Sequence, residues 1–202
     1  MINRKFAGAC AILGGLMAIG LTLPFAAAYF IAYPGYELPP FWYYPVLRLL
    51  QPALGFGEAI EVYNTYGRIY NLVYVLFLPA TLALHALHRG VHSRLEGWGF
   101  WLTVVGLIAS LIGVAGDYWA NGAGFILELL GLLVLVAGCV LTGMAAWRSK
   151  LLPEWSAALL MACLPGYVIW FRLIGHIPSG PTFGVALAYL GVGIVLLSGK
   201  QE

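Results

Sequence analysis

Four ionisable residues in the C-terminal half of the chain have the types and spacing of a polar site. Asp117 and Glu128 flank a short polar turn, and Arg172 and His176 are four residues apart. Four residues is about one helical turn, so Arg172 and His176 share a helical face. Two acids that lie close together tend to raise the pKa of one of them, and an arginine opposes that shift. Such a set suits proton handling or the binding of a polar headgroup.

A second pair, Arg68 and Asn71, is three residues apart and also shares a helical face. These two residues complete the predicted ligand-binding set with Asp117, Glu128 and the Arg172–His176 pair. The residue types alone assign no catalytic role. The chain has no HExxH, GxSxG, Walker or prenyl-diphosphate aspartate motif, which argues against the familiar hydrolases that carry such motifs.

The remaining histidines and the cysteines are weaker candidates for chemistry. His85, His88 and His92 follow one another near the end of an apolar segment. Metal or haem ligation would need partners that are not evident, so we interpret these histidines as a solvated helix end and expect no metal. The three cysteines lack metal-ligand spacing, and we interpret them as buried small apolar residues. They are Cys10, Cys139 and Cys163. No cofactor is indicated.

The elements that position these residues follow from the composition. Hydrophobic residues make up 62% of the 202 residues, and charged residues only 9%, whereas a soluble domain usually carries about 25% charged residues. Lipid must therefore solvate most of the exterior. This predicts one all-α domain over 1–202, a polytopic bundle of transmembrane helices with the lipid bilayer as its main partner. No Lys/Arg run indicates a nucleic-acid surface.

Six apolar segments approach or exceed the roughly 20 residues that a spanning helix needs. Loop-forming pairs such as Asn121-Gly122 and Leu152-Pro153 separate them. The first segment resembles a signal peptide, but its apolar run is longer than the about 7–15 residues of a signal sequence, so we expect an uncleaved span. The predicted spans are about 6–33, 67–88, 97–118, 124–147, 155–175 and 181–198.

The distribution of Lys and Arg predicts the orientation. With the N-terminus inside, seven of the ten basic residues fall on the inner side and three on the outer side. The positive-inside rule then places both termini in the cytoplasm. Asp117, Glu128, Arg172 and His176 all come to the outer side in this arrangement.

The one long connection, 34–66, lies on the outer side between the first two spans. It carries an aromatic cluster, Phe41-Trp42-Tyr43-Tyr44, that suits the headgroup region. Residues 46–50 and 58–63 are predicted to form short helices that lie on the membrane. The connection is either a cap over a site or an interfacial anchor with no further role.

Glycines recur every seven residues in three of the predicted spans, and this spacing is typical of a tight helix–helix seam. The stripes are Gly99, Gly106 and Gly113; Gly124, Gly131 and Gly138; and Gly184 and Gly191. Asp117 and Glu128 fall on the first two stripes. We therefore expect spans 97–118 and 124–147 to form an antiparallel hairpin in which both acids point at neighbouring helices.

Two interpretations of the ionisable residues stay open. In one, Asp117, Glu128, Arg172 and His176 are interfacial charges or a structural ion-pair network. In the other, they line an outward-opening pocket, because charged side chains within spans usually face the bundle interior and pair there.

Three short stretches resemble segments of uncharacterised bacterial multi-pass membrane proteins. They are Gly116-Asp117-Tyr118-Trp119, Leu151-Leu152-Pro153-Glu154-Trp155 and Gly175-His176-Ile177-Pro178-Ser179-Gly180-Pro181. The likeness covers about the C-terminal half. It implies six helices and a bacterial inner membrane, and it implies no activity and no site residue.

Three functions fit these observations. The first is binding or transport of a small amphiphilic or lipid-like ligand at an outward-facing polar site. The second is a membrane-embedded enzyme acting on a lipid or isoprenoid, with Asp117 or Glu128 as acid/base and Arg172 on an anionic group. The third is a non-catalytic subunit that packs against copies of itself or other membrane proteins through its glycine stripes.

Overall fold

A computed structural model describes residues 3–35, 38–88, 93–120 and 122–199 of the chain. The regular elements in this part of the chain are eight α-helices. They are α1 (Arg4–Ala32), α2 (Tyr43–Leu54), α3 (Ala59–Leu87), α4 (Arg94–Trp119), α5 (Phe125–Ser149), α6 (Glu154–Met161), α7 (Cys163–Ile174) and α8 (Ser179–Ser198).

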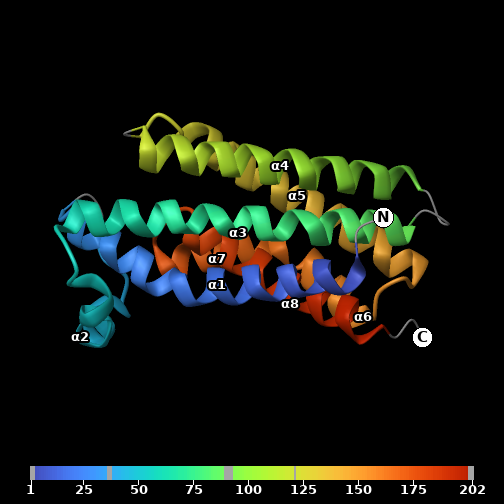
Figure 1. The fold of residues 1–202 in the computed structure, drawn as a ribbon, viewed down its shortest axis with the longest axis horizontal. Helices are drawn as coiled ribbons and strands as arrows, with labels where there is room; N and C mark the ends of the chain where they lie inside the picture. The colour runs from blue at the N-terminus through green and yellow to red at the C-terminus, as the bar shows by residue number, and fades with distance from the viewer. Residues whose placement is uncertain (1–2, 36–37, 89–92, 121, 200–202) are drawn as a thin grey trace.

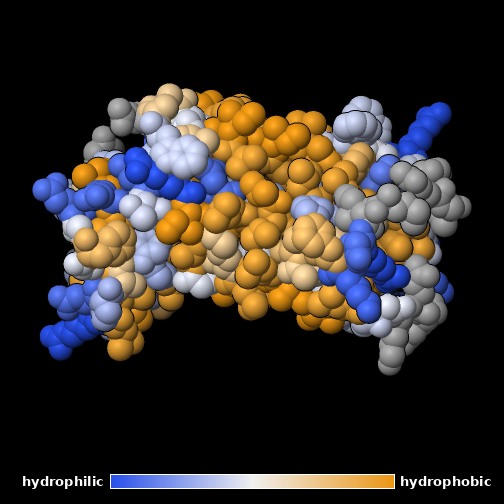
Figure 2. Space-filling model, viewed as in Figure 1, coloured by the Kyte–Doolittle hydropathy of each residue, from blue (hydrophilic) through white to orange (hydrophobic). Residues whose placement is uncertain are grey.

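Five of these helices, α1, α3, α4, α5 and α8, are long and apolar enough to cross a membrane. Helices α6 and α7 pass the same test only together, and they are bent by 56° where they meet. Hydrophobic side chains form a broad band around the middle of the molecule, and hydrophilic ones gather at its two ends (Figure 2). This is the pattern of a membrane protein whose middle is solvated by lipid.

The long helices form a bundle in which α1 packs against α3 and α8, and α4 packs against α3 and α5. Helix α6 contacts both α5 and α8, which closes the arrangement. The chain starts and finishes at the same end of the bundle, and α2 lies at the opposite end (Figure 1).

The predicted hairpin of spans 97–118 and 124–147 is confirmed, because its glycines face protein. A Cβ atom on Gly106 would lie 2.3 Å from the backbone nitrogen of Leu135, and one on Gly138 would lie 2.3 Å from that of Thr103. Such distances are impossible for a real side chain, so the backbones of α4 and α5 touch only because glycine is present.

A second glycine seam joins α1 to α8 and was not predicted. A Cβ atom on Gly8 would lie 3.0 Å from the carbonyl oxygen of Gly193, and one on Gly15 would lie 2.9 Å from that of Ala186. The first and last helices of the chain are therefore packed closely together, although less closely than α4 and α5. Gly8 and Gly15 are seven residues apart, so the spacing used for the other spans could have indicated this seam.

Two predicted boundaries are wrong at the end of the bundle that carries α2. Residues 58–63, expected as a separate helix on the membrane, belong to the first turns of α3, which starts at Ala59 rather than at 67. The buried face of α3 runs without interruption through Val62, Tyr63 and Tyr66. Glu58 and Glu61 are exposed, so they leave the apolar face of α3 intact.

The predicted span 155–175 is not one continuous helix. The chain bends by 56° at the junction of α6 and α7, three residues before Pro165. Pro165 has no backbone N–H, so the carbonyl of Met161 loses its helical hydrogen-bond donor. Helix α6 ends at Met161 for this reason.

We predict that Gly106→Ala lowers the thermal stability of the protein in detergent. The new Cβ atom overlaps the α5 backbone, and overpacking of this kind costs about 1–3 kcal/mol. Gly97→Ala on the same helix is the matched control, because no atom lies within 4 Å of its added Cβ. Equal melting temperatures for the two variants would contradict the seam.

Candidate functional site

A pocket of about 610 Å³ opens near the end of the bundle that carries α2. Its walls come from the end of α1, the start of α3, the turn between α4 and α5, and the connection between α7 and α8. Six of the lining residues are tyrosines or phenylalanines: Tyr29, Tyr33, Tyr63, Tyr118, Phe125 and Phe171. Asn64, Asp117 and His176 supply its polar side chains.

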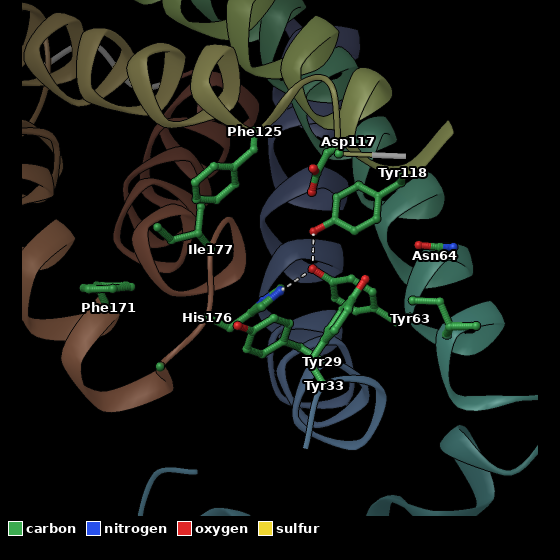
Figure 3. Close-up of a pocket in the computed structure, with 13 residues that line it drawn as sticks. Tyr29, Tyr33, Tyr63, Asn64, Asp117, Tyr118, Phe125, Phe171, His176 and Ile177 are labelled. Carbon is green, nitrogen blue, oxygen red and sulfur yellow. Dashed lines mark hydrogen bonds between the residues drawn. The ribbon is translucent and has the colours of Figure 1, made fainter. Parts of the chain in front are cut away.

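A chain of hydrogen bonds crosses the floor of the pocket (Figure 3). The hydroxyls of Tyr118 and Tyr63 are 2.9 Å apart, and the Tyr63 hydroxyl lies 3.3 Å from Nε2 of His176. The other ring nitrogen, Nδ1, lies 2.9 Å from the hydroxyl of Ser179. Side chains from α3, α4 and α8 are thus joined through one imidazole.

Phe25 supports this chain from within the bundle. Its ring, which is fully buried, lies 4.6 Å from the imidazole of His176 and 5.4 Å from the ring of Tyr118, measured between centroids. Aromatic pairs at such distances are favourable beyond their buried area. A residue of α1 therefore holds the histidine and the tyrosine in place.

The backbone around His176 explains why the imidazole points inward. Gly175 ends α7 in the left-handed conformation, with φ of 73°, which glycine adopts without strain. The carbonyl of His176 then accepts the backbone N–H of Gly180 at 2.9 Å, at the start of α8. The connection between α7 and α8 is therefore held at both ends, and His176 sits on its inner side with 3% exposure.

Burial keeps His176 uncharged. Burial lowers the pKa of His176 from its ordinary value of 6.5 to about 3. In a neutral imidazole one nitrogen donates a hydrogen bond and the other accepts one. The hydrogen bonds from Tyr118 to Ser179 therefore all run in one direction or all in the other, and a change of tautomer reverses them.

A glycine on α3 makes room for Tyr118. A Cβ atom on Gly67 would lie 2.1 Å from Cγ of the Tyr118 ring, so any other residue would displace the ring. The close approach of α3 and α4 at this point brings the Tyr118 hydroxyl to Tyr63. Gly67 therefore helps to position Tyr118 in the pocket wall, although Gly67 itself does not line the pocket.

The two acids that the sequence singled out lie at different depths. Asp117 is partly exposed, and its carboxylate points into the pocket beside Tyr118 (Figure 3). Glu128 is only 1% exposed, and neither of its oxygens has a hydrogen-bond partner among the described residues. It lies near enough to Tyr63, Tyr70 and Tyr118 to act on them electrostatically. Its heptad position correctly indicated an inward direction.

Asn71 of the predicted set lies inside the bundle, and the two arginines point outward. Asn71 is 6% exposed, with both amide atoms unpartnered in the described structure. Arg68 is exposed and donates from Nε to the backbone carbonyl of Tyr118 at 3.2 Å.

Arg172 is exposed, lies outside the pocket lining, and forms no ion pair with Asp117 or Glu128, all three being described residues. The sequence could not determine the rotation of α7. Of the four residues expected to converge, Asp117 and His176 line the pocket, Glu128 is buried outside the lining, and Arg172 is exposed outside it.

The tyrosines are the main site residues that the sequence analysis missed. Four of them follow one face of α3, at intervals of three and four residues: Tyr63, Tyr66, Tyr70 and Tyr74. This spacing is that of a buried helical face, and four hydroxyls on a face turned away from lipid signal a hydrogen-bonded interior. The start of this face was missed because 58–63 was predicted to be a separate short helix on the membrane.

Helix α2 does not cap the pocket. None of the described lining residues belongs to it. Its flanking Trp42 donates from Nε1 to the carbonyl of Leu173 at 2.9 Å, and the carbonyl of Ala53 accepts from the Tyr66 hydroxyl at 2.7 Å. The segment is therefore docked on α7 and α3 at this end of the bundle.

The prediction of a solvated helix end at His85 and His88 is wrong. Nδ1 of His85 lies 2.6 Å from a carboxylate oxygen of Glu96, and His88 is 1% exposed with Nδ1 2.8 Å from the carbonyl of Leu84. His92 lies outside the described residues. Across the described ranges, no three His, Cys, Asp or Glu side chains are placed to hold a metal ion.

The three cysteines are buried, as predicted.

Comparisons of the chain with protein-family models, with curated proteins and with solved structures found no match.

We predict that His176 makes the fold sensitive to acid. Because the pKa of His176 is about 3 in the folded protein and 6.5 without the fold, the unfolded chain takes up a proton first as the pH falls. Between about pH 7.5 and about pH 5 this should remove about 2 kcal/mol of stability.

The check is thermal unfolding in detergent at both pH values, with His176→Gln as the comparison. The variant cannot take up this proton, so its loss of stability between the two values should be smaller. Parallel curves for wild type and variant would show that His176 does not titrate as described. Other groups titrate equally in both proteins and cancel in the difference.

Proposed function

We propose that this protein binds or transports a small amphiphilic or lipid-like ligand at the aromatic pocket near its outer end. The observation that supports this most directly is the pocket itself. Its volume of about 610 Å³ falls in the range of about 300–1,000 Å³ that is typical of small-molecule sites. Such sites are mostly apolar with a few placed polar groups, which is the composition of this lining.

The location of the pocket favours an amphiphile over a fully polar solute. The pocket lies near the end of the bundle that carries α2, and hydrophilic side chains gather at that end of the apolar band (Figure 2). A molecule with an apolar tail and a polar head has both of its parts matched at such a boundary. Tyrosine rings, which are apolar with one polar end, suit the same place.

A second function is favoured by the hydrogen-bonded chain. Tyr118, Tyr63 and His176 carry exchangeable protons at the floor of a pocket, and a neutral imidazole can accept one proton while giving up another. A membrane-embedded enzyme acting on a lipid would use such a relay for acid/base chemistry. Arg172, which was expected to bind an anionic group, lies outside the pocket, so this version of the proposal depends on His176 instead.

The hypothesis of a non-catalytic subunit loses the observation on which it rested. The striped glycines of α4 and α5 pack against the facing helix of the pair, and Gly184 and Gly191 of α8 face α7 and α6. The stripes are therefore used within the chain and do not offer a free face for a partner.

For the topology, we propose six crossings of a bacterial inner membrane, with α6 and α7 together forming one of them. An even number of crossings agrees with a chain that starts and finishes at one end of the bundle (Figure 1). The excess of basic residues at that end places it in the cytoplasm by the positive-inside rule.

A cysteine introduced at Phe56 should react with an impermeant thiol reagent added to intact cells, and one introduced at Glu154 should not. Both positions are exposed, at opposite ends of the chain's predicted topology, and the native cysteines are buried. Labelling at Glu154→Cys without labelling at Phe56→Cys would show that the protein has the opposite orientation.

The ligand proposal predicts that the purified protein carries a lipid-like molecule that a pocket-filling variant loses. Ile60→Trp places a large ring in the lining, so mass spectrometry of the extracted protein should show the bound molecule strongly reduced. Ile69→Trp is the matched control, because Ile69 lies on the same helix with a similar exposed fraction, 39% against 41%, and outside the lining. Equal retention by both variants would contradict the proposal.

A further inference from the structure

The charged side chain in the described lining of the pocket is acidic. Asp117 is the acidic side chain in the lining, and Glu128 lies buried behind it. His176 is neutral, and Asn64 is an uncharged amide. Among the described residues that line the pocket there is no Lys or Arg. A negatively charged ligand group would therefore enter without a counter-charge, and burial of an unpaired charge is costly.

The basic side chains closest in sequence to the pocket walls are directed elsewhere. The Arg68 guanidinium is exposed and bonds to the carbonyl oxygen of Tyr118, not to the Asp117 carboxylate. Arg172 is exposed and lies outside the lining. Asp117 consequently has no ion-pair partner among the described residues, and its charge is available to a ligand.

The aromatic lining has the same electrostatic preference. The face of each ring carries partial negative charge, so a cation within about 6 Å of a ring centre is attracted to it. Tyr29, Tyr63 and Tyr118 stand around the space beside Asp117 (Figure 3). A cage of rings next to a carboxylate is the arrangement by which proteins recognise ammonium groups.

We infer that the polar group of the ligand is a cation, an ammonium or alkylated ammonium group held between the Asp117 carboxylate and the tyrosine rings. The inference rests on the proposed function, because it names the chemistry of the ligand that the same pocket would bind. Two sources supply such a group: the headgroup of a zwitterionic or cationic lipid, and a soluble amine.

The test is the shift in melting temperature of the purified protein in a nonionic detergent, with probes that differ in charge. The probes are decyltrimethylammonium, its uncharged tert-butyl isostere, decyl sulfate, and choline without an alkyl chain. At about pH 8, well above the ordinary aspartate pKa of about 3.9, the ammonium amphiphile should stabilise the protein at the lowest concentration. Stabilisation by choline as well identifies a soluble amine, and its absence identifies a lipid headgroup.

Asp117→Asn keeps the shape of the side chain and removes its charge, so it should weaken binding of the ammonium amphiphile by about tenfold or more. Binding of the uncharged isostere should not change. Glu61→Gln is the matched control, since it removes an acid that is exposed and lies outside the pocket lining. A loss of the same size in Glu61→Gln would show a general effect of charge and overturn the inference.

The two proposals fail in different ways. If the isostere or decyl sulfate stabilises the protein as well as the ammonium probe does, the ligand is not selected for positive charge and the inference is wrong, while the pocket remains a binding site. If no probe stabilises the protein, and Ile60→Trp and wild type carry the same lipids, the proposed binding function itself is wrong.

Discussion

The backbones of α4 and α5 touch near the turn that joins them, and the geometry of the pocket depends on this contact. A Cβ atom on Gly124 would overlap the carbonyl oxygen of Gly113, and one on Gly113 would lie 2.3 Å from the backbone nitrogen of Glu128. No other residue fits at either position. The turn is therefore held tightly, and Asp117 and Tyr118 are placed on one side of it with Glu128 on the other.

Lipid imposes the second constraint, because it offers no hydrogen bonds to a polar group. Several polar side chains of α3 accordingly turn inward and find partners on α4 and α8. The Tyr74 hydroxyl meets that of Thr182 at 3.2 Å, and Thr81 meets Tyr189 one step further along. Together with Tyr63 and His85 they form a line of polar contacts from one end of the bundle to the other.

Features that depend on composition and on periodicity could be predicted from the sequence. The helical bundle follows from the shortage of charged residues, and the α4–α5 hairpin follows from glycines repeated every seven residues. The inward direction of Glu128 follows from its place on the same stripe. These are local properties, since each is decided by residues of one or two neighbouring segments.

Features that depend on how one helix is rotated against distant ones could not be predicted. Arg172 and His176 would share a face if the helix continued through both residues. Helix α7 ends at Ile174, however, and Gly175 turns the chain, so the imidazole enters the bundle and the guanidinium does not. Likewise, Tyr63 was assigned to the connection between the first two spans. Only its contacts with Tyr118 and His176 show that it belongs to the hydrogen-bonded chain of the pocket. Partners so far apart in sequence are brought together by tertiary packing alone.

The connection between α7 and α8 has a consequence for the biosynthesis of the protein. Ribosomes deliver the chain from its N-terminus, so α3, α4 and α5 are made before His176 and Ser179. Until then the Tyr63 and Tyr118 hydroxyls have only each other, and α1 has not met the last helix. The final insertion step therefore both closes the α1–α8 seam and completes the floor of the pocket.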